Sequence, residues 1–127
     1  GDNIFFGGNL NSQLRIGITN LKKGLSTIYG KKVNNPKEFG VINFDKENKI
    51  SHIIEKPRHT KSNIIVSGLY FYTNDVVKFA KKLKPSKRGE KEITDINNHY
   101  LSASRLKLIR LDSKISWMQS YDMRRLG

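Results

Sequence analysis

A ten-residue run of apolar and β-prone side chains, residues 63–72 (NIIVSGLYFY), constrains the fold of this chain more than any other segment. A strand with one face in solvent alternates apolar and polar residues, whereas this run is almost continuously apolar. It is therefore predicted to be a β-strand that other layers cover on both faces. At 127 residues the chain has one-domain length and can bury a modest core around such a strand.

Amphipathic patterns predict three helices, at residues 10–21, 75–83 and 92–101. The first has leucine and isoleucine at helical spacing, asparagines flanking its first residue as candidate N-caps, and Gly24 as a stop. Gly17 inside it weakens the helical signal. The third is predicted to start near Thr94 or Asp95 and to turn two apolar residues inward, Ile96 and Tyr100.

Further strands are predicted at residues 25–33, 41–45, 50–56, 105–112 and 115–118. The polar turn KENK joins the second and third of these into a hairpin. A hairpin implies antiparallel pairing, and strands that alternate with helices imply crossovers. The chain is therefore predicted to have an α/β fold with a mixed sheet.

The composition restricts partners more than it identifies them. The formal net charge is +13, which favours an anionic partner, but the lysines are scattered in pairs, as on a solvated surface. There is no cysteine, so disulfides and thiolate metal sites are excluded. No apolar stretch reaches the length of a membrane span or signal-peptide core, so no membrane partner and a cytoplasmic location are expected.

Four loops carry polar residues that could bind a ligand. Asp2 follows the first glycine, and Gly40 stands where a loop enters a strand. Glu55 and Lys56 place an acceptor and a cation side by side at a strand end, and Arg88 precedes a helix. Each has a plain alternative: a turn former, a turn glycine, a strand exit before proline, and a solvated loop.

Taken in order, these segments resemble one family. GDNIFFG (1–7), NNPKEFGVINFD (34–45), IIEKP (53–57) and the long stretch 61–97 are similar to the glucose-1-phosphate thymidylyltransferases, a family of sugar-phosphate nucleotidyltransferases. The resemblance extends from Gly1 to about Trp117, and 61–97 is its most specific part. It implies a partial Rossmann-like mixed sheet with a β-hairpin and flanking helices. Residues 1–127 would form the sugar-phosphate-binding and C-terminal part of the domain, without the nucleotide-binding half.

The resemblance also implies residue roles. Asp2 matches a magnesium ligand, while Gln119 stands where the family has its second metal carboxylate; glutamine is a weaker ligand for a hard cation. The other implied roles are in sugar-phosphate binding. Glu55 and Lys56 match a pair that holds the sugar hydroxyls and the phosphate, and Arg88 matches a second phosphate-holding cation. The remaining matched positions in the sugar site are Gly40, Val66, Tyr70 and Trp117.

The implied reaction joins dTTP and glucose 1-phosphate into dTDP-glucose and pyrophosphate with Mg²⁺, for nucleotide-sugar, rhamnose and surface polysaccharide biosynthesis. Without the nucleotide-binding half, this chain is expected to be inactive alone and to self-associate. Two alternatives stay open. One is a degenerate, non-catalytic remnant that binds sugar phosphate weakly, which Gln119 favours. The other is a basic nucleic-acid-binding protein, although no helix-turn-helix, RNA-binding or zinc pattern supports it.

Overall fold

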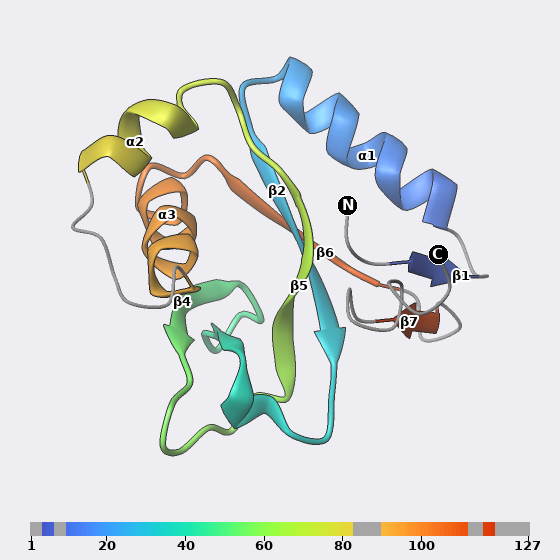
Figure 1. Ribbon diagram of the computed structural model, residues 1–127, viewed down its shortest axis with the longest axis vertical. Coiled ribbons are helices and arrows are strands. Elements are labelled where there is room, and N and C mark those ends of the chain that lie inside the picture. The colour runs from blue at the N-terminus through green and yellow to red at the C-terminus, as the bar shows by residue number, and fades with distance from the viewer. Residues whose placement is uncertain (1–3, 7–9, 83–89, 112–115, 119–127) are drawn as a thin grey trace.

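A curled five-stranded mixed sheet forms the centre of the computed structural model, with helices on both of its faces (Figure 1). The structure describes residues 4–6, 10–82, 90–111 and 116–118. The strand order in the sheet is β4-β3-β5-β2-β6. Its strands are β2 (Ser26–Lys32), β3 (Gly40–Phe44), β4 (Ile50–Glu55), β5 (Ile64–Phe71) and β6 (Leu106–Arg110).

The helices are α1 (Leu10–Lys22), α2 (Val76–Lys82) and α3 (Glu90–Ser102), with a 3₁₀ turn, η1 (Pro36–Glu38), ahead of β3. A separate two-stranded antiparallel sheet pairs β1 (Ile4–Phe6) with β7 (Ser116–Met118). The predicted α/β class, the mixed sheet and the hairpin of β3 and β4 are confirmed. The predicted start of α3 near Thr94 or Asp95 is wrong: the helix begins at Glu90, so Thr94 lies in its second turn.

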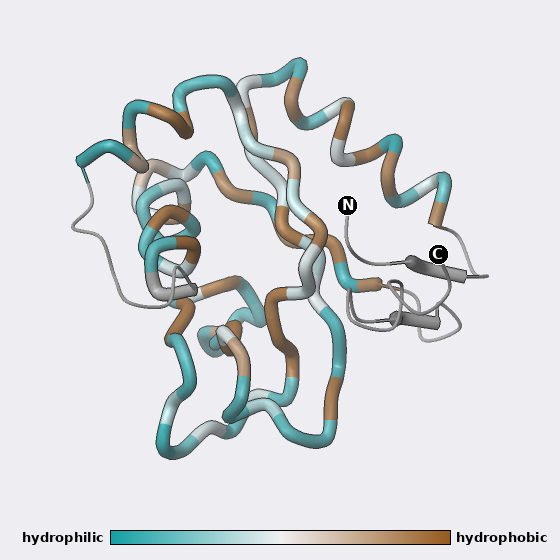
Figure 2. The backbone as a smooth tube through the Cα atoms, viewed as in Figure 1, coloured by the Kyte–Doolittle hydropathy of each residue, from teal (hydrophilic) through white to brown (hydrophobic). Residues whose placement is uncertain are grey.

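Alternation along β2 explains why the sheet has two cores. Successive strand residues point to opposite faces, so Ile28 packs with Ile96 and Tyr100 of α3, while Tyr29 packs with residues of α1. Ile28 and Tyr29 are both fully buried. Hydrophobic residues gather along the strands, whereas the loops at the lower end of the view in Figure 2 are mainly hydrophilic.

The pairing of β5 is unequal along its two edges. It runs antiparallel to β2 over most of its length, but meets β3 only where Val41 pairs with Ile65. Its register with β2 also shifts: Ile28 pairs with Tyr70 and Gly30 with Val66, so one residue of β2 faces three of β5. Such irregularities are common beside binding sites, and this one lies between Val66 and Tyr70.

Candidate functional site

A cavity of about 140 Å³ lies where β3 diverges from β5, under α3. Its volume is several times the ~30 Å³ that one water molecule occupies in the liquid, so it has room for a small polar ligand. Its wall combines apolar and aromatic groups with a few polar ones, the usual make-up of a small-molecule site. The lining residues are Glu38, Phe39, Gly40, Glu55, Val66, Tyr70, Ile93, Thr94 and Asn97.

Asn98 fixes α3 above this cavity. Its side-chain nitrogen donates to the carbonyl oxygen of Ile53 (2.7 Å), and its side-chain oxygen accepts from the Ile53 amide (3.0 Å). Because β4 is at the edge of the sheet, these bonds pair backbone groups that no neighbouring strand meets. The helix is thereby held so that Thr94 and Asn97, three residues apart and on one side of α3, face the cavity.

Glu55 supplies a carboxylate that is held at the cavity wall. It ends β4, and its Oε1 accepts a hydrogen bond of 2.9 Å from Thr94 Oγ1. Gly40 pairs with Glu55 across the hairpin, and a Cβ on Gly40 would stand 3.2 Å from Glu55 Oε1 and 3.4 Å from Thr94 Oγ1. A side chain at position 40 would crowd this bond, so β3, β4 and α3 together define the place of the carboxylate at the cavity wall.

Two tyrosines complete the polar groups near the cavity: Tyr70 of β5 and Tyr72, which follows that strand. Tyr70 lines it, and burial, together with the negative charge of Glu55, raises the pKa of Tyr70 to about 12. Its ring stacks on Tyr72 at 5.4 Å between centroids. Burial raises the pKa of Tyr72 as well, with smaller effects from Tyr70 and Tyr100. Both hydroxyls therefore remain protonated at neutral pH and can donate hydrogen bonds.

The structure brings four of the predicted site residues to the same cavity: Gly40, Glu55, Val66 and Tyr70. They come from three strands and from positions up to thirty residues apart in the chain. Asp2, Arg88 and Gln119 lie outside the described residues. Trp117 lies in β7, in register with Phe5 of β1.

Lys56 lies beside the cavity without lining it. It follows Glu55 directly, its side chain is exposed, and its amide donates to the Phe39 carbonyl at 2.9 Å. Its φ of 45° is in the left-handed region, which costs a residue with a Cβ about 1 kcal/mol or more. Such strained backbone clusters at binding sites, which is consistent with the role that the resemblance implies for Lys56.

Sequence reasoning missed Thr94 and Asn97 as members of the site. Both are polar residues on the buried face of α3, between and beside the predicted inward residues, and both are buried. Polar side chains at core positions were the available signal. The sequence-based prediction instead placed Thr94 near the start of the helix. Within the described ranges, no group of three or more histidine and acidic side chains could hold a metal ion.

The fold is that of a nucleotidyltransferase. A model of the nucleotidyl transferase family matches residues 1–119, so the chain belongs to that family. Within it, the chain is 42% identical over 120 residues to the glucose-1-phosphate thymidylyltransferase of Xanthomonas campestris pv. campestris (strain B100), covering 94% of this chain and 40% of that protein. The enzyme of the same name from Neisseria gonorrhoeae is 41% identical, over 94% and 41%. The chain thus spans about two-fifths of the length of these relatives.

Solved structures agree with this assignment. A Bacillus anthracis protein described as a glucose-1-phosphate thymidylyltransferase, solved in complex with sucrose, superposes with a TM-score of 0.75 at 36% identity, covering 98% of this chain and 49% of that one. A UDP-glucose pyrophosphorylase solved with UDP-glucose gives a TM-score of 0.71 at 24% identity, covering 90% and 47%, a likeness of fold. In the part of the chain that the structure describes, no helix is long and apolar enough to cross a membrane.

Proposed function

We propose that this chain is the sugar-phosphate-binding part of a glucose-1-phosphate thymidylyltransferase. The observation that carries the proposal is the convergence of Gly40, Glu55, Val66 and Tyr70 on one cavity. These residues come from separate segments of the sequence, and the family resemblance implies a place in the sugar site for each of them. Similarity to thymidylyltransferases over 94% of the chain supports the same assignment.

The proposed reaction is nucleotidyl transfer. A phosphate oxygen of glucose 1-phosphate attacks the α-phosphorus of dTTP, a new P–O bond forms, and the bond to the β-phosphate oxygen breaks, releasing pyrophosphate. The protein's task is to bring two anions together and to neutralise their charge. Mg²⁺, predicted from the resemblance alone, would contribute part of that neutralisation when bound.

The residues of this chain would bind and orient the sugar phosphate. The Glu55 carboxylate, held by Thr94, accepts hydrogen bonds from sugar hydroxyls, and the Tyr70 hydroxyl donates or accepts one. Val66 supplies an apolar wall for the ring. Lys56, at the strand end beside Glu55, is proposed to hold the phosphate together with Arg88.

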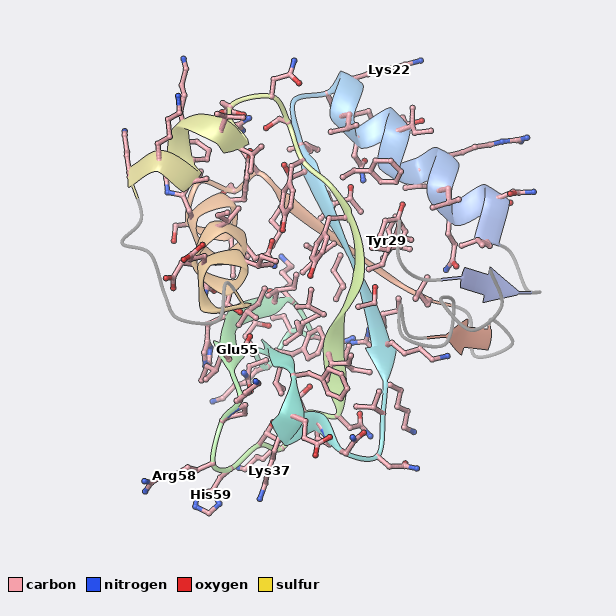
Figure 3. All side chains as sticks on the ribbon, viewed as in Figure 1. Lys22, Tyr29, Lys37, Glu55, Arg58 and His59 are labelled. Atoms are coloured by element: carbon pink, nitrogen blue, oxygen red, sulfur yellow. The ribbon has the colours of Figure 1, made fainter. Side chains whose placement is uncertain are left out.

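Calorimetric titration of the chain with glucose 1-phosphate tests the proposal. A charge-assisted hydrogen bond contributes about 1.5–3 kcal/mol, so Lys56→Ala should weaken binding roughly ten- to a hundredfold. Glu55→Ala should weaken glucose 1-phosphate binding similarly but leave inorganic phosphate binding nearly unchanged. Lys22→Ala is the matched control, because Lys22 lies at the far end of the molecule from Glu55 (Figure 3).

The competing explanation is that phosphate condenses on a surface of net charge +13. In that case Lys56→Ala and Lys22→Ala would have equal effects, and binding would disappear at moderate salt for every variant. Equal effects of the two lysines would refute the assignment of the site.

A non-catalytic remnant is the second candidate function, and Gln119 favours it, because the family's second metal carboxylate would stand there. The chain alone is predicted to release no pyrophosphate from dTTP and glucose 1-phosphate with Mg²⁺, since it spans only two-fifths of its relatives' length. Mg²⁺-dependent pyrophosphate release by the chain would overturn this second candidate.

A further inference from the structure

The side-chain amide of Asn97 has one satisfied end and one unsatisfied end. Tyr72 Oη donates to Asn97 Oδ1 at 2.6 Å. Asn97 Nδ2 is buried and has no hydrogen-bond partner among the described residues. In this arrangement the amide oxygen accepts from Tyr72, and the two N–H donors of the amide are the part left over.

Asn98, the next residue, shows the contrast. Both ends of its amide bond the backbone of Ile53, so its role in holding α3 to β4 is complete. The two asparagines share a helix and differ by one position, yet only Asn97 lines the cavity. A donor that is buried and unpaired costs free energy, so such groups are rare in folded proteins unless something else pairs with them.

The wall around Asn97 suits a hydroxyl-bearing ligand. A hydroxyl both donates and accepts, and this cavity presents the Glu55 carboxylate as an acceptor and the Asn97 amide as a donor. Because Asn97 is 0% exposed, a ligand can contact its amide only by packing closely against the wall of the cavity. The terminal torsion of asparagine is soft, which lets the amide turn toward the ligand.

We infer that Asn97 is a further substrate-binding and specificity residue, whose amide nitrogen donates to a hydroxyl oxygen of the sugar ring. This inference rests on the proposed function, because it places a sugar in the cavity. It adds a donor from α3 to the residues of β3, β4 and β5 that the family resemblance supplied. A ring that lacks the relevant hydroxyl leaves the donor unpaired, so the site selects against that deoxy sugar.

The test compares glucose 1-phosphate with its 2-, 3-, 4- and 6-deoxy analogues, by calorimetry on the full chain. For the wild type, one analogue should bind about tenfold more weakly than the others, beyond any loss shared with Glu55→Ala. Asn97→Asp keeps the acceptor for Tyr72 and removes the donor, so it should weaken glucose 1-phosphate binding about tenfold and abolish the discrimination against that analogue. Asp95→Asn, at an exposed position of α3, is the matched control and should keep the discrimination.

A measurement on the wild type guards against a variant that does not fold. The side-chain NH₂ signals of Asn97 in ¹H–¹⁵N spectra should shift when glucose 1-phosphate binds. Unchanged signals with bound ligand, or an Asn97→Asp variant that keeps every affinity, would mean that only a buried water meets this nitrogen, and the inference would be wrong while the proposed function stands. Absence of glucose 1-phosphate binding by the wild type would overturn both.

Discussion

The two faces of the sheet differ in how closely they are packed and in whether their buried polar atoms are paired. On the α1 face, helix and sheet fit closely, and the buried polar atoms have partners: Tyr29 Oη donates to the Gln13 carbonyl at 2.7 Å, and Asn20 Nδ2 donates to Thr27 Oγ1 at 2.9 Å. On the α3 face, β3 and β5 part, a cavity remains, and the buried Asn97 Nδ2 has no partner among the described residues.

This difference distinguishes the α1 face, which stabilises the fold, from the α3 face, which carries the candidate site. A face that serves stability alone gains from filling every void and pairing every donor. The α3 face departs from both rules at one place, and it does so beside a carboxylate held at fixed position and a lysine with left-handed backbone. Local departures of this kind are expected where binding, not stability, determines the residues.

The largest effect on stability is expected for Gly17→Ala, on the close-packed α1 face. A Cβ at Gly17 would stand 2.5 Å from a ring carbon of Phe71 and still closer to the Tyr29 hydroxyl. Overpacking of this kind costs about 1–3 kcal/mol, which outweighs the gain of about 1 kcal/mol in helix propensity. Urea unfolding should therefore show a net loss of stability, whereas Thr19→Ala at an exposed position of α1 should show none. A stabilised Gly17→Ala variant would contradict the close fit.

Gly17 also shows where prediction from sequence succeeds and fails. The apolar spacing of residues 10–21 was sufficient to predict α1, since periodicity is a local property. From the sequence alone, Gly17 only weakens the helical signal. The structure shows why a glycine is needed there: the position is in close contact with Tyr29 and Phe71, distant residues of two strands. Local signals thus predicted the elements, and the packing between them required the structure.

The second prediction concerns Gly40→Ala, which adds a methyl group at the cavity on the α3 face. A Cβ there would stand 3.2 Å from Glu55 Oε1, tight enough to displace the carboxylate by a few tenths of an ångström. Gly40→Ala should weaken glucose 1-phosphate binding about tenfold, the effect of one hydrogen bond, and change unfolding free energy by less than about 1 kcal/mol. Titration and urea unfolding of the same variant separate the two effects. A large loss of stability with unchanged affinity would show that this face is scaffold as well.

The residues of the candidate site were predicted in a different way from the fold. Glu55 and Gly40 were found because their motifs resemble a family, not because local chemistry required them. Thr94 and Asn97 lie within the stretch 61–97 that carries the resemblance, but no site role was carried over for them. Their place at the cavity depends on where α3 docks. That docking depends on Asn98 meeting the edge of β4, a long-range contact that no local pattern encodes.

The third prediction measures the strain at Lys56. Glycine adopts a φ of 45° without the steric cost that a Cβ imposes, so Lys56→Gly should be more stable than Lys56→Ala by about 1 kcal/mol. Both variants lack the ammonium group and should lose glucose 1-phosphate affinity equally. Asn48→Gly, at another left-handed position (φ 64°) in the hairpin turn, serves as a control that should not affect binding. Equal stabilities of Lys56→Gly and Lys56→Ala would show that the left-handed backbone at Lys56 is not strained.

The smallest expected effect concerns the link between the two faces. Arg105 Nη1 donates to Asp75 Oδ2 at 2.7 Å ahead of α2, and its Nε donates to the Gly24 carbonyl at 3.1 Å after α1. The hydrogen bonds from Arg105, and then from Thr73, hold the pKa of Asp75 well below its usual range. A carboxyl group with a lowered pKa in the folded state stabilises the protein above its unfolded pKa, near 3.9, and loses that contribution as the pH falls through the folded value.

Urea unfolding between pH 6 and pH 2 tests this link with the wild type and Asp75→Asn. The wild type should be more stable than the variant at pH 6, and the difference should shrink below about pH 4, as the pH approaches the folded pKa of Asp75. The effect should be small, because the two side chains are about one-third exposed, at 33% and 31%, and water screens the pair. The core signals of both faces, read from Tyr29 and Tyr100, should be lost in one transition at each pH. Separate transitions in Asp75→Asn alone would show that this pair couples the α1 face to the α3 face.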